Sequence, residues 1–218
     1  MRHFKNFKTC VYCTAQTLAS LDETTLARDY AYLEKYVGID KVYLETYRDG
    51  TWVAIDHMKM IQNFFKEHGV EIAGGITTVT PPLEKDDAKR QRLFQTFCYS
   101  NEAMRTYLKK IVTYTAELFD EIILDDFFFT SCTCDDCLRE RSNLSWAEFR
   151  SKKMIDVAEN LVLKPAKLAN PSVKVTIKYP NWRESYHETG YVPKIQPSMF
   201  DKIYTGTETR NTAHTDQH

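Results

Sequence analysis

The stretch Asp120-Glu-Ile-Ile-Leu-Asp-Asp-Phe-Phe-Phe129 combines a short apolar run with two adjacent carboxylates at its end. A continuous apolar run of this length, bounded by charged residues, is typical of a strand buried on both faces of a parallel sheet. Because successive side chains of a strand point to opposite faces, Asp125 and Asp126 would point in opposite directions. The sequence therefore predicts a buried strand with acidic chemistry at its carboxyl end.

Helical patterns separate similar short strands along the rest of the chain. Strands are expected near residues 8–12, 41–46, 70–76, 121–127, 173–178 and 202–204. Apolar residues at helical spacing predict helices over residues 23–37, 54–68, 100–119 and 145–170. Ser100 would cap the third helix, Ser145 and Glu148 would form a capping box on the fourth, and Gly69 would end the second. No tight hairpin is expected between strands, so the alternation predicts a parallel sheet with crossover helices.

Polar residues at the strand ends favour a barrel over an open doubly wound sheet. They stand at residues 13–14, 45–48, 77–78, 125–126, 178–179 and 205–210, and barrel enzymes place their chemistry at this carboxyl-end rim. No strand is followed by the G-x-G-x-x-G loop of dinucleotide-binding sheets. The prediction is an α/β fold of the TIM-type (β/α)8 class, truncated after the sixth strand, with residues 1–218 as one incomplete barrel domain. Its open edges would favour self-association into a homo-oligomer.

Composition excludes several classes of partner. The formal net charge is -1, which gives no electrostatic argument for nucleic acid or an anionic membrane surface. No apolar run reaches the roughly 18 residues of a membrane span, and the first residues lack the features of a secretory signal. The compartment therefore stays open, with the cytoplasm as the default expectation.

The cysteines are clustered in a way that favours a metal site over disulfides. Three of the six lie in Cys132-Thr-Cys134-Asp-Asp-Cys137, just past the fourth predicted strand. Zinc binds thiolates in tetrahedral sets of four, so a fourth ligand is needed. Cys98 is the first candidate, an aspartate such as Asp135 or Asp136 or a water is the second, and a metal-free cluster is the third. Zinc held by four thiolates would be structural, because no coordination position stays open.

Carboxylates at the rim suggest hydrolysis of a glycosidic bond. Two flanking carboxyl groups are the minimum machinery for that reaction, and Glu208, which follows the sixth predicted strand, would be the partner of the Asp125–Asp126 pair. The predicted catalytic residues are thus Asp125, Asp126 and Glu208. The residues expected to bind the substrate are Glu45, Arg48, Lys178, Tyr179, Trp182 and Arg210.

From Cys98-Tyr-Ser-Asn-Glu-Ala-Met through the aspartate pair to the cysteine cluster, the sequence resembles glycoside-hydrolase barrels, and in particular the zinc-bearing β-galactosidases and their barrel relatives. The resemblance implies a structural zinc on Cys98, Cys132, Cys134 and Cys137. This chain differs from those enzymes after the fourth strand. They carry an Asn-Glu pair there, and this chain has Asp125-Asp126. A second resemblance, to α-galactosidase-like barrels, implies an aspartate nucleophile after strand four and an acid/base at Glu208.

Three functions follow as expectations. The first is a glycoside hydrolase that acts on an oligo- or polysaccharide through its rim carboxylates. The second is a carbohydrate-binding barrel without catalysis, in which Trp182, Tyr179 and residues 127–129 stack on the sugar. The third is a structural or interaction module stabilised by zinc.

Overall fold

A computed structural model describes residues 4–80, 92–181 and 185–206 of the chain. In chain order the elements are β1 (Cys10–Cys13), α1 (Ala15–Ser20), α2 (Glu23–Tyr36), β2 (Lys41–Arg48), β3 (Thr51–Trp52), α3 (Ile55–Glu67), β4 (Glu71–Ile76), η2 (Leu93–Gln95), α4 (Glu102–Leu118), β5 (Glu121–Leu124), α5 (Asp135–Arg141), α6 (Trp146–Val157), η3 (Ala158–Leu163), α7 (Lys164–Ala169), β6 (Lys174–Tyr179), α8 (Tyr186–Thr189), η5 (Gln196–Ser198) and β7 (Lys202–Thr205).

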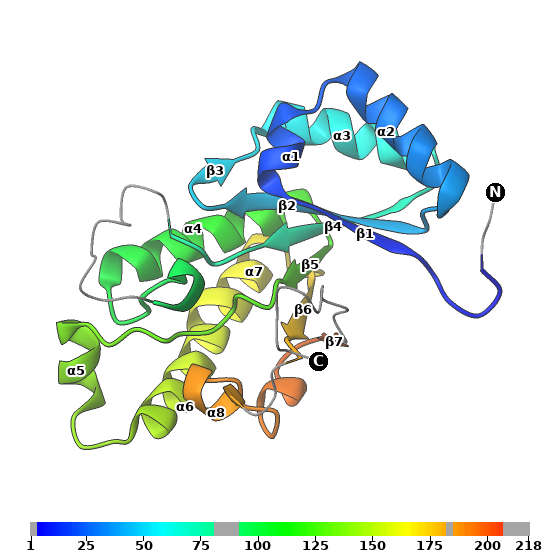
Figure 1. Cartoon of the computed structure of the whole chain (residues 1–218). Coiled ribbons are helices and arrows are strands. Elements are labelled where there is room, and N and C mark those ends of the chain that lie inside the picture. Colours follow the sequence, from blue (N-terminus) through cyan, green and yellow to red (C-terminus); the bar gives the residue numbers. More distant parts are fainter. Residues whose placement is uncertain (1–3, 81–91, 182–184, 207–218) are drawn as a thin grey trace, which may run out of the picture.

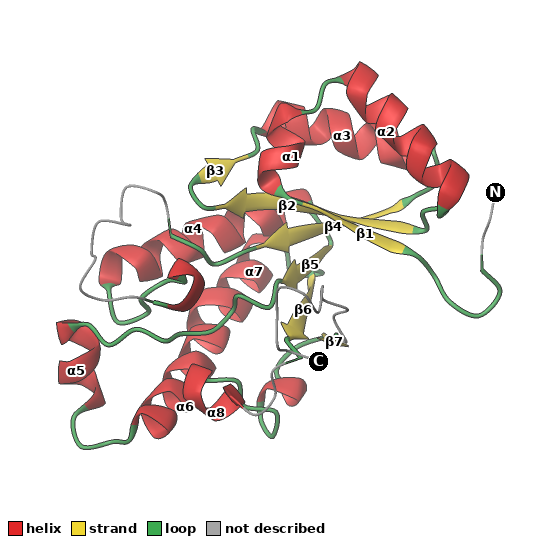
Figure 2. Ribbon diagram, in the orientation of Figure 1, coloured by secondary structure: helices red, strands yellow, loops and turns green. Residues whose placement is uncertain are grey.

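The sheet is a parallel half-barrel with helices on its outer side (Figure 1, Figure 2). Its order within the described residues is β1-β2-β4-β5-β6-β7, with every neighbouring pair parallel and β3 attached to β2 alone. Parallel strands need crossovers, and the helices between successive strands supply them. The predicted TIM-like α/β architecture and the six predicted strands are confirmed.

The pairing register determines which side chains face the inside of the arc. Tyr12 pairs with Tyr43, Tyr43 with Ala73, and the next strand contributes Ile123 to the same layer. These four residues form a small apolar cluster of their own. Since side chains alternate along a strand, the residues two positions further on, Glu45, Gly75 and Asp125 among them, share this inner face at the carboxyl end. The inner face is thus apolar in the middle and polar at the rim.

Two separate cores lie between the outer face of the sheet and the helices. Val42 and Leu44 of β2 pack with buried residues of α1, α2 and α3 in one core. In the other, Val175 and Ile177 of β6 pack with residues of α4, η3 and α7. Figure 1 shows α1 to α3 over β1 and β2, α4 beside β2 and β4, and α7 beside β5. The helices hold the strand ends in place, and so position the rim.

Gly74 of β4 allows α4 to approach the sheet closely. A Cβ atom at this position would lie 2.6 Å from Thr115 Cγ2 and 2.8 Å from Phe119 Cδ2. We expect Gly74→Ala to lower the free energy of unfolding by about 1–3 kcal/mol, because overpacking in a well-packed core costs that much. Urea denaturation would measure it. Gly206→Ala is the matched control, since a Cβ there meets nothing within 4 Å, and equal losses in both variants would contradict the steric explanation.

The hairpin between β2 and β3 was not expected from the sequence, and the prediction that no strands are joined by tight turns is wrong. The turn residues Asp49 and Gly50 both have positive φ, 49° and 83°. Positive φ at both central positions fits the turns that match the twist of paired strands, and Asp-Gly is a preferred dipeptide for them. This turn sets the pairing of the two strands, in which Trp52 lies opposite Tyr47 and Thr51 lies opposite Arg48.

Helix ends agree with the sequence except at α4. Asn101 rather than Ser100 is its N-cap, and the Asn101 side chain accepts a hydrogen bond from Met104 N. The capping box of Ser145 and Glu148 is confirmed. The single helix expected over residues 145–170 is interrupted by the π-helical segment η3, which joins α6 to α7.

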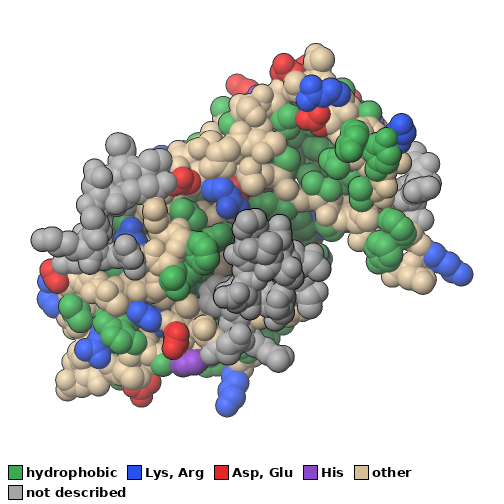
Figure 3. Space-filling view, viewed as in Figure 1, with side chains coloured by type: hydrophobic (Ala, Val, Ile, Leu, Met, Phe, Trp, Pro, Cys, Tyr) green, Lys and Arg blue, Asp and Glu red, His purple; other side chains and the backbone are tan. Residues whose placement is uncertain are grey.

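The surface carries charges of both signs. Lys, Arg, Asp and Glu side chains are intermingled on the face that Figure 3 shows, and hydrophobic side chains gather near α2 at its upper right. No helix within the described ranges is long and apolar enough to cross a membrane.

Candidate functional site

The carboxyl ends of β2, β4, β5 and β6 bring polar side chains together around Asp125. Asp125 Oδ2 accepts a hydrogen bond from Arg48 Nη2 at 3.0 Å and lies 3.3 Å from Thr77 Oγ1. Asp125 Oδ1 accepts from Lys178 Nζ at 3.1 Å and from the backbone N–H of Asp126 at 3.0 Å. We call Glu45, Arg48, Asp125, Asp126 and Lys178 the rim cluster.

Glu45 is the fully buried member of the rim cluster. Its side chain is 0% exposed, and it accepts hydrogen bonds from Tyr12 OH at 2.8 Å and from the backbone N–H of Ala15 at 2.7 Å. Arg48 Nε donates to Glu45 Oε2 at 2.9 Å, and Thr77 Oγ1 also donates to this carboxylate. Glu45 therefore fixes the guanidinium that holds Asp125. Contact between Glu45 and a substrate, which the sequence predicts, stays a prediction.

Lys178 connects the two aspartates of β5. Its ammonium lies 3.1 Å from Asp125 Oδ1 and 3.1 Å from Asp126 Oδ2. Tyr179 follows it on β6 and, by strand alternation, points to the helical side of the sheet. There it is 4% exposed and belongs to the core. The structure therefore brings Lys178 to the rim cluster and does not bring Tyr179 there.

Charge balance within the rim cluster keeps Asp125 ionised. Burial raises the pKa of Asp125, but the cations Lys178 and Arg48 outweigh burial and hold that pKa below its usual value. Burial lowers the pKa of Lys178, and Asp125 and Asp126 more than offset it, so this pKa is raised. Three carboxylates face two cations, which leaves one excess negative charge where a cationic reaction centre could be stabilised.

Three predicted site residues lie outside the described residues: Trp182, Glu208 and Arg210. Their roles stay predictions. The sequence analysis placed Tyr12 in the first strand but missed it as a donor to Glu45. It also missed the pairing of Arg48 with Asp125, because residues 77 positions apart meet only through the sheet register.

The four cysteines Cys98, Cys132, Cys134 and Cys137 come together beside α5. All four are buried, and their Sγ atoms lie within 4.8 Å of one another. Cys98 Sγ is 3.6 Å from both Cys134 Sγ and Cys137 Sγ, and the latter two are 3.7 Å apart. A tetrahedron with metal–sulfur bonds of about 2.3 Å has edges of about 3.8 Å, whereas a disulfide is about 2.05 Å long. The spacing fits four ligands of one ion.

The four thiols influence one another's protonation. Without a metal, the hydrogen bond with Cys132 raises the pKa of the Cys98 thiol and raises that of Cys137 to about 12, while the bonds with Cys137 and Cys98 lower the pKa of Cys132. Buried thiols that repel one another's ionised forms become four thiolates only when a metal compensates their charge. Arg150, stacked with Arg141 on the Trp146 ring, lies close enough for an electrostatic effect on Cys137 and Cys132. The positive charge of Arg150 would partly balance the two negative charges of zinc bound by four thiolates.

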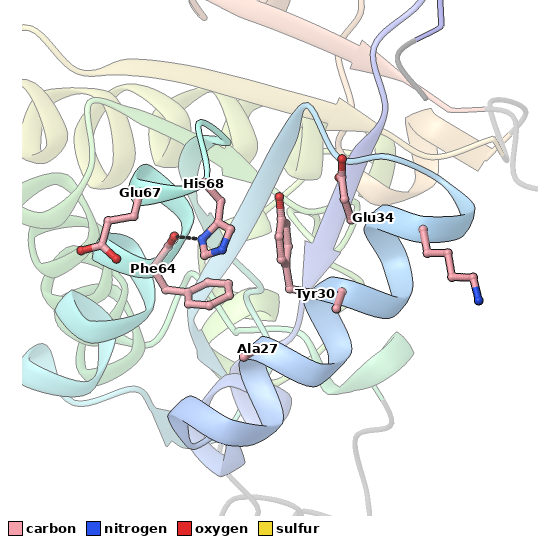
Figure 4. A pocket seen from close by; sticks show the side chains of 8 residues that line it. Ala27, Tyr30, Glu34, Phe64, Glu67 and His68 are labelled. Atoms are coloured by element: carbon pink, nitrogen blue, oxygen red, sulfur yellow. Dashed lines mark hydrogen bonds between the residues drawn. The ribbon is translucent and has the colours of Figure 1, made fainter. Parts of the chain in front are cut away.

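A groove between α2 and α3 lies away from both sites (Figure 4). It has a volume of about 740 Å³, and the side chains of Tyr30, Phe64 and His68 meet in it, with His68 Nδ1 hydrogen-bonded to Phe64 O. The groove lies near the C-terminal end of α3, which precedes the amino end of β4. Barrel enzymes use the opposite, carboxyl end of the strands, so the groove is not the candidate active site.

Comparison with known proteins agrees with the fold. Residues 1–218 match the family described as "Probable glycosyl hydrolase, catalytic domain". An uncharacterised protein of Saccharolobus solfataricus is 34% identical over 230 residues, which cover 94% of this chain and 38% of that protein. The chain thus spans less than half the length of that curated relative.

Two solved β-galactosidases have the same fold. The cold-adapted enzyme of a Rahnella species aligns with a TM-score of 0.67 at 10% identity, over 93% of this chain and 40% of its own. The enzyme of the psychrophilic Marinomonas aligns with a TM-score of 0.67 at 12% identity, over 93% of this chain and 41% of its own. At these identities the likeness concerns the fold, and the family match over the whole chain decides the relationship. The chain belongs to the family of probable glycosyl hydrolase catalytic domains.

Proposed function

We propose that this protein hydrolyses a glycosidic bond in an oligo- or polysaccharide, with Asp125 at the centre of the site. The observation that carries the proposal is the position of Asp125 at the carboxyl end of β5, held by both Arg48 and Lys178. The family match supports the reaction class. Because the chain covers about two fifths of its β-galactosidase neighbours, the activity of the whole protein is part of the proposal.

Asp125 is the group that enters the reaction as an anion. Its lowered pKa makes it a poor proton donor and suits a nucleophile or an anion that stabilises an oxocarbenium-like transition state. Arg48 and Lys178 fix its two oxygens in one orientation. Proton donation to the leaving oxygen must then come from another acid, and Glu208 is the proposed donor. Asp126, which shares Lys178 with Asp125, is the second candidate for a direct role.

The cysteine cluster is the proposed structural zinc site. Cys98, Cys132, Cys134 and Cys137 would hold the ion, and zinc with four thiolates supplies no open coordination position for chemistry. The cluster begins a few residues after Asp126, so the ion would tie the segment that follows β5 to the start of α4 through Cys98. Its contribution is to hold this segment beside the rim.

Lys178 provides a test of the ionisation of Asp125. In Lys178→Met, burial would be opposed mainly by Arg48, so the pKa of Asp125 should rise. If ionised Asp125 is required, the acidic limb of the kcat/KM profile should move to higher pH, and activity that wild type retains at low pH should be lost. Steady-state hydrolysis of an aryl glycoside between pH 3 and pH 8 would measure it.

The control is Lys174→Met, an exposed lysine at the start of the same strand. Its profile should match wild type. An unshifted acidic limb in Lys178→Met, with activity retained, would contradict the role of Asp125 as the essential anion.

A carbohydrate-binding barrel without catalysis is the second candidate. One observation favours it: each Asp125 oxygen already accepts hydrogen bonds from the chain itself. Of the aromatic residues expected to stack on a sugar, Phe128 and Phe129 are buried, and Phe127 keeps a partly exposed ring. Sugar binding with no turnover by the protein would favour this alternative over hydrolysis.

A further inference from the structure

Phe94 has an unusual combination of backbone conformation and exposure. It lies in η2 with φ 52° and ψ 18°, and the next residue, Gln95, has φ 55°. Left-handed backbone is costly for a residue with a bulky side chain, and a glycine would adopt it freely. The Phe94 side chain gains little burial in return, because it is 60% exposed. Folding stability alone does not explain a phenylalanine here.

Hydrogen bonds on both sides hold η2 in this conformation. Leu93 N donates to Ser131 Oγ at 2.7 Å. Gln95 O accepts from Thr80 N and from Thr80 Oγ1, both at 2.9 Å. Thr96 then pairs with Val79 in an isolated β-bridge. Strained backbone persists where its surroundings fix it in this way, and such residues cluster at ligand sites.

Phe94 is connected to the rim cluster through Phe127. The two ring centroids are 5.2 Å apart with the rings nearly perpendicular, at 88°. The guanidinium carbon of Arg48 lies 5.6 Å from the Phe127 ring centroid, and Arg48 binds Asp125. Thr78 Oγ1 donates to Phe127 O at 2.6 Å, which ties the backbone of Phe127 to the segment that follows β4. An unbroken chain of contacts thus runs from the carboxylate to the exposed ring.

We propose that Phe94 is a sugar-stacking platform that binds a pyranose ring next to the one at Asp125, with Phe94 held in place by its perpendicular contact with Phe127. The inference rests on the proposed function and deepens it, because it assigns the residue that binds a second sugar unit of the oligo- or polysaccharide. The C–H face of a pyranose is apolar, and a rigid exposed ring buries it at little cost in conformational entropy. Neither Phe94 nor its segment was among the residues expected from the sequence.

The test compares sugars of two lengths on two variants. Probes are the methyl glycosides and the β-1,4-linked trisaccharides of galactose, glucose and mannose, with dissociation constants measured by saturation-transfer NMR. Phe94→Gly removes the ring and relieves the backbone, and Phe94→Tyr keeps the ring. We expect Phe94→Gly to weaken trisaccharide binding about tenfold, as loss of one aromatic contact with its buried area would. Methyl glycoside binding should change less than twofold, and Phe94→Tyr should bind like wild type.

Thermal unfolding separates this role from a structural one. If Phe94 is a platform held in a strained conformation, Phe94→Gly relieves that strain. Its melting temperature should then be equal to or above that of wild type. A fall of several degrees together with weaker binding would overturn the inference, as would unchanged trisaccharide affinity or equal weakening for both sugar lengths. In those cases the proposed function still stands if Asp125→Asn abolishes turnover. Absence of binding by every sugar to unaltered protein would contradict the inference and the proposed function together.

Discussion

Asp125→Asn is expected to lower kcat for glycoside hydrolysis by about a thousandfold or more, a size typical of removing a group that acts at the reacting bond. The amide keeps the shape of the side chain but has no charge, so it cannot act as a nucleophile or stabilise positive charge on the sugar. Arg48 and Lys178 would each also lose one of two anionic partners, and would keep Glu45 and Asp126 respectively. Initial rates at saturating substrate, with far-ultraviolet circular dichroism to verify folding, would measure the effect.

The matched control is Asp120→Asn, an exposed aspartate at the amino end of β5. It carries the same chemical change directly before the same strand, away from the rim cluster, and should retain wild-type kcat. If both variants kept full activity, Asp125 would not be part of the machinery. If Asp126→Asn alone abolished turnover, the roles of the two aspartates would be exchanged.

Loss of zinc is the second large effect that we expect. Protein purified without added metal should contain about one zinc per chain, and Cys98→Ser should contain almost none. The free energy of unfolding should fall by about 4 kcal/mol or more, because loss of a structural metal is among the changes that destabilise most. Inductively coupled plasma mass spectrometry and chemical denaturation would measure the two quantities.

Cys10→Ser is the control for this experiment. Cys10 is an exposed free thiol in β1, outside the four-cysteine cluster, so its removal should leave the zinc content unchanged. Unaltered protein with no metal and six reactive thiols would contradict the zinc site. A Cys98→Ser variant with undiminished zinc would contradict Cys98 as a ligand, and would point instead to Asp135, Asp136 or a water as the fourth ligand.

Much of the fold could be predicted because it depends on local patterns. Buried strands such as 121–124 are short apolar runs, and amphipathic helices such as 55–67 have apolar residues at helical spacing. The fourth cysteine of the cluster could also be predicted, since α4 and β5 return the chain from Cys98 to the other three. The hairpin at Asp49-Gly50 carried a known signal that the sequence reading did not use.

The rim cluster was predicted as a set of positions but not as a network. Asp125, Lys178 and Arg48 each end a strand, yet which cation meets which carboxylate depends on sheet register and on the bulge between Glu45 and Tyr47. Tyr179 was expected at the site because it follows Lys178, but adjacent residues of a strand face opposite ways. Phe94 had no sequence signal, since hydrogen bonds from distant residues impose its conformation.

The most direct test of the central claim, that this protein is a glycoside hydrolase acting through Asp125, is proton NMR of sugar release. Wild-type protein and Asp125→Asn would be incubated with α- and β-galactosides, glucosides and mannosides, and the anomeric signals followed in time. We predict turnover of at least one glycoside by wild type, with one anomer formed first, and none by Asp125→Asn. Equal turnover by the two proteins, or binding without turnover by wild type at every pH tested, would contradict the claim.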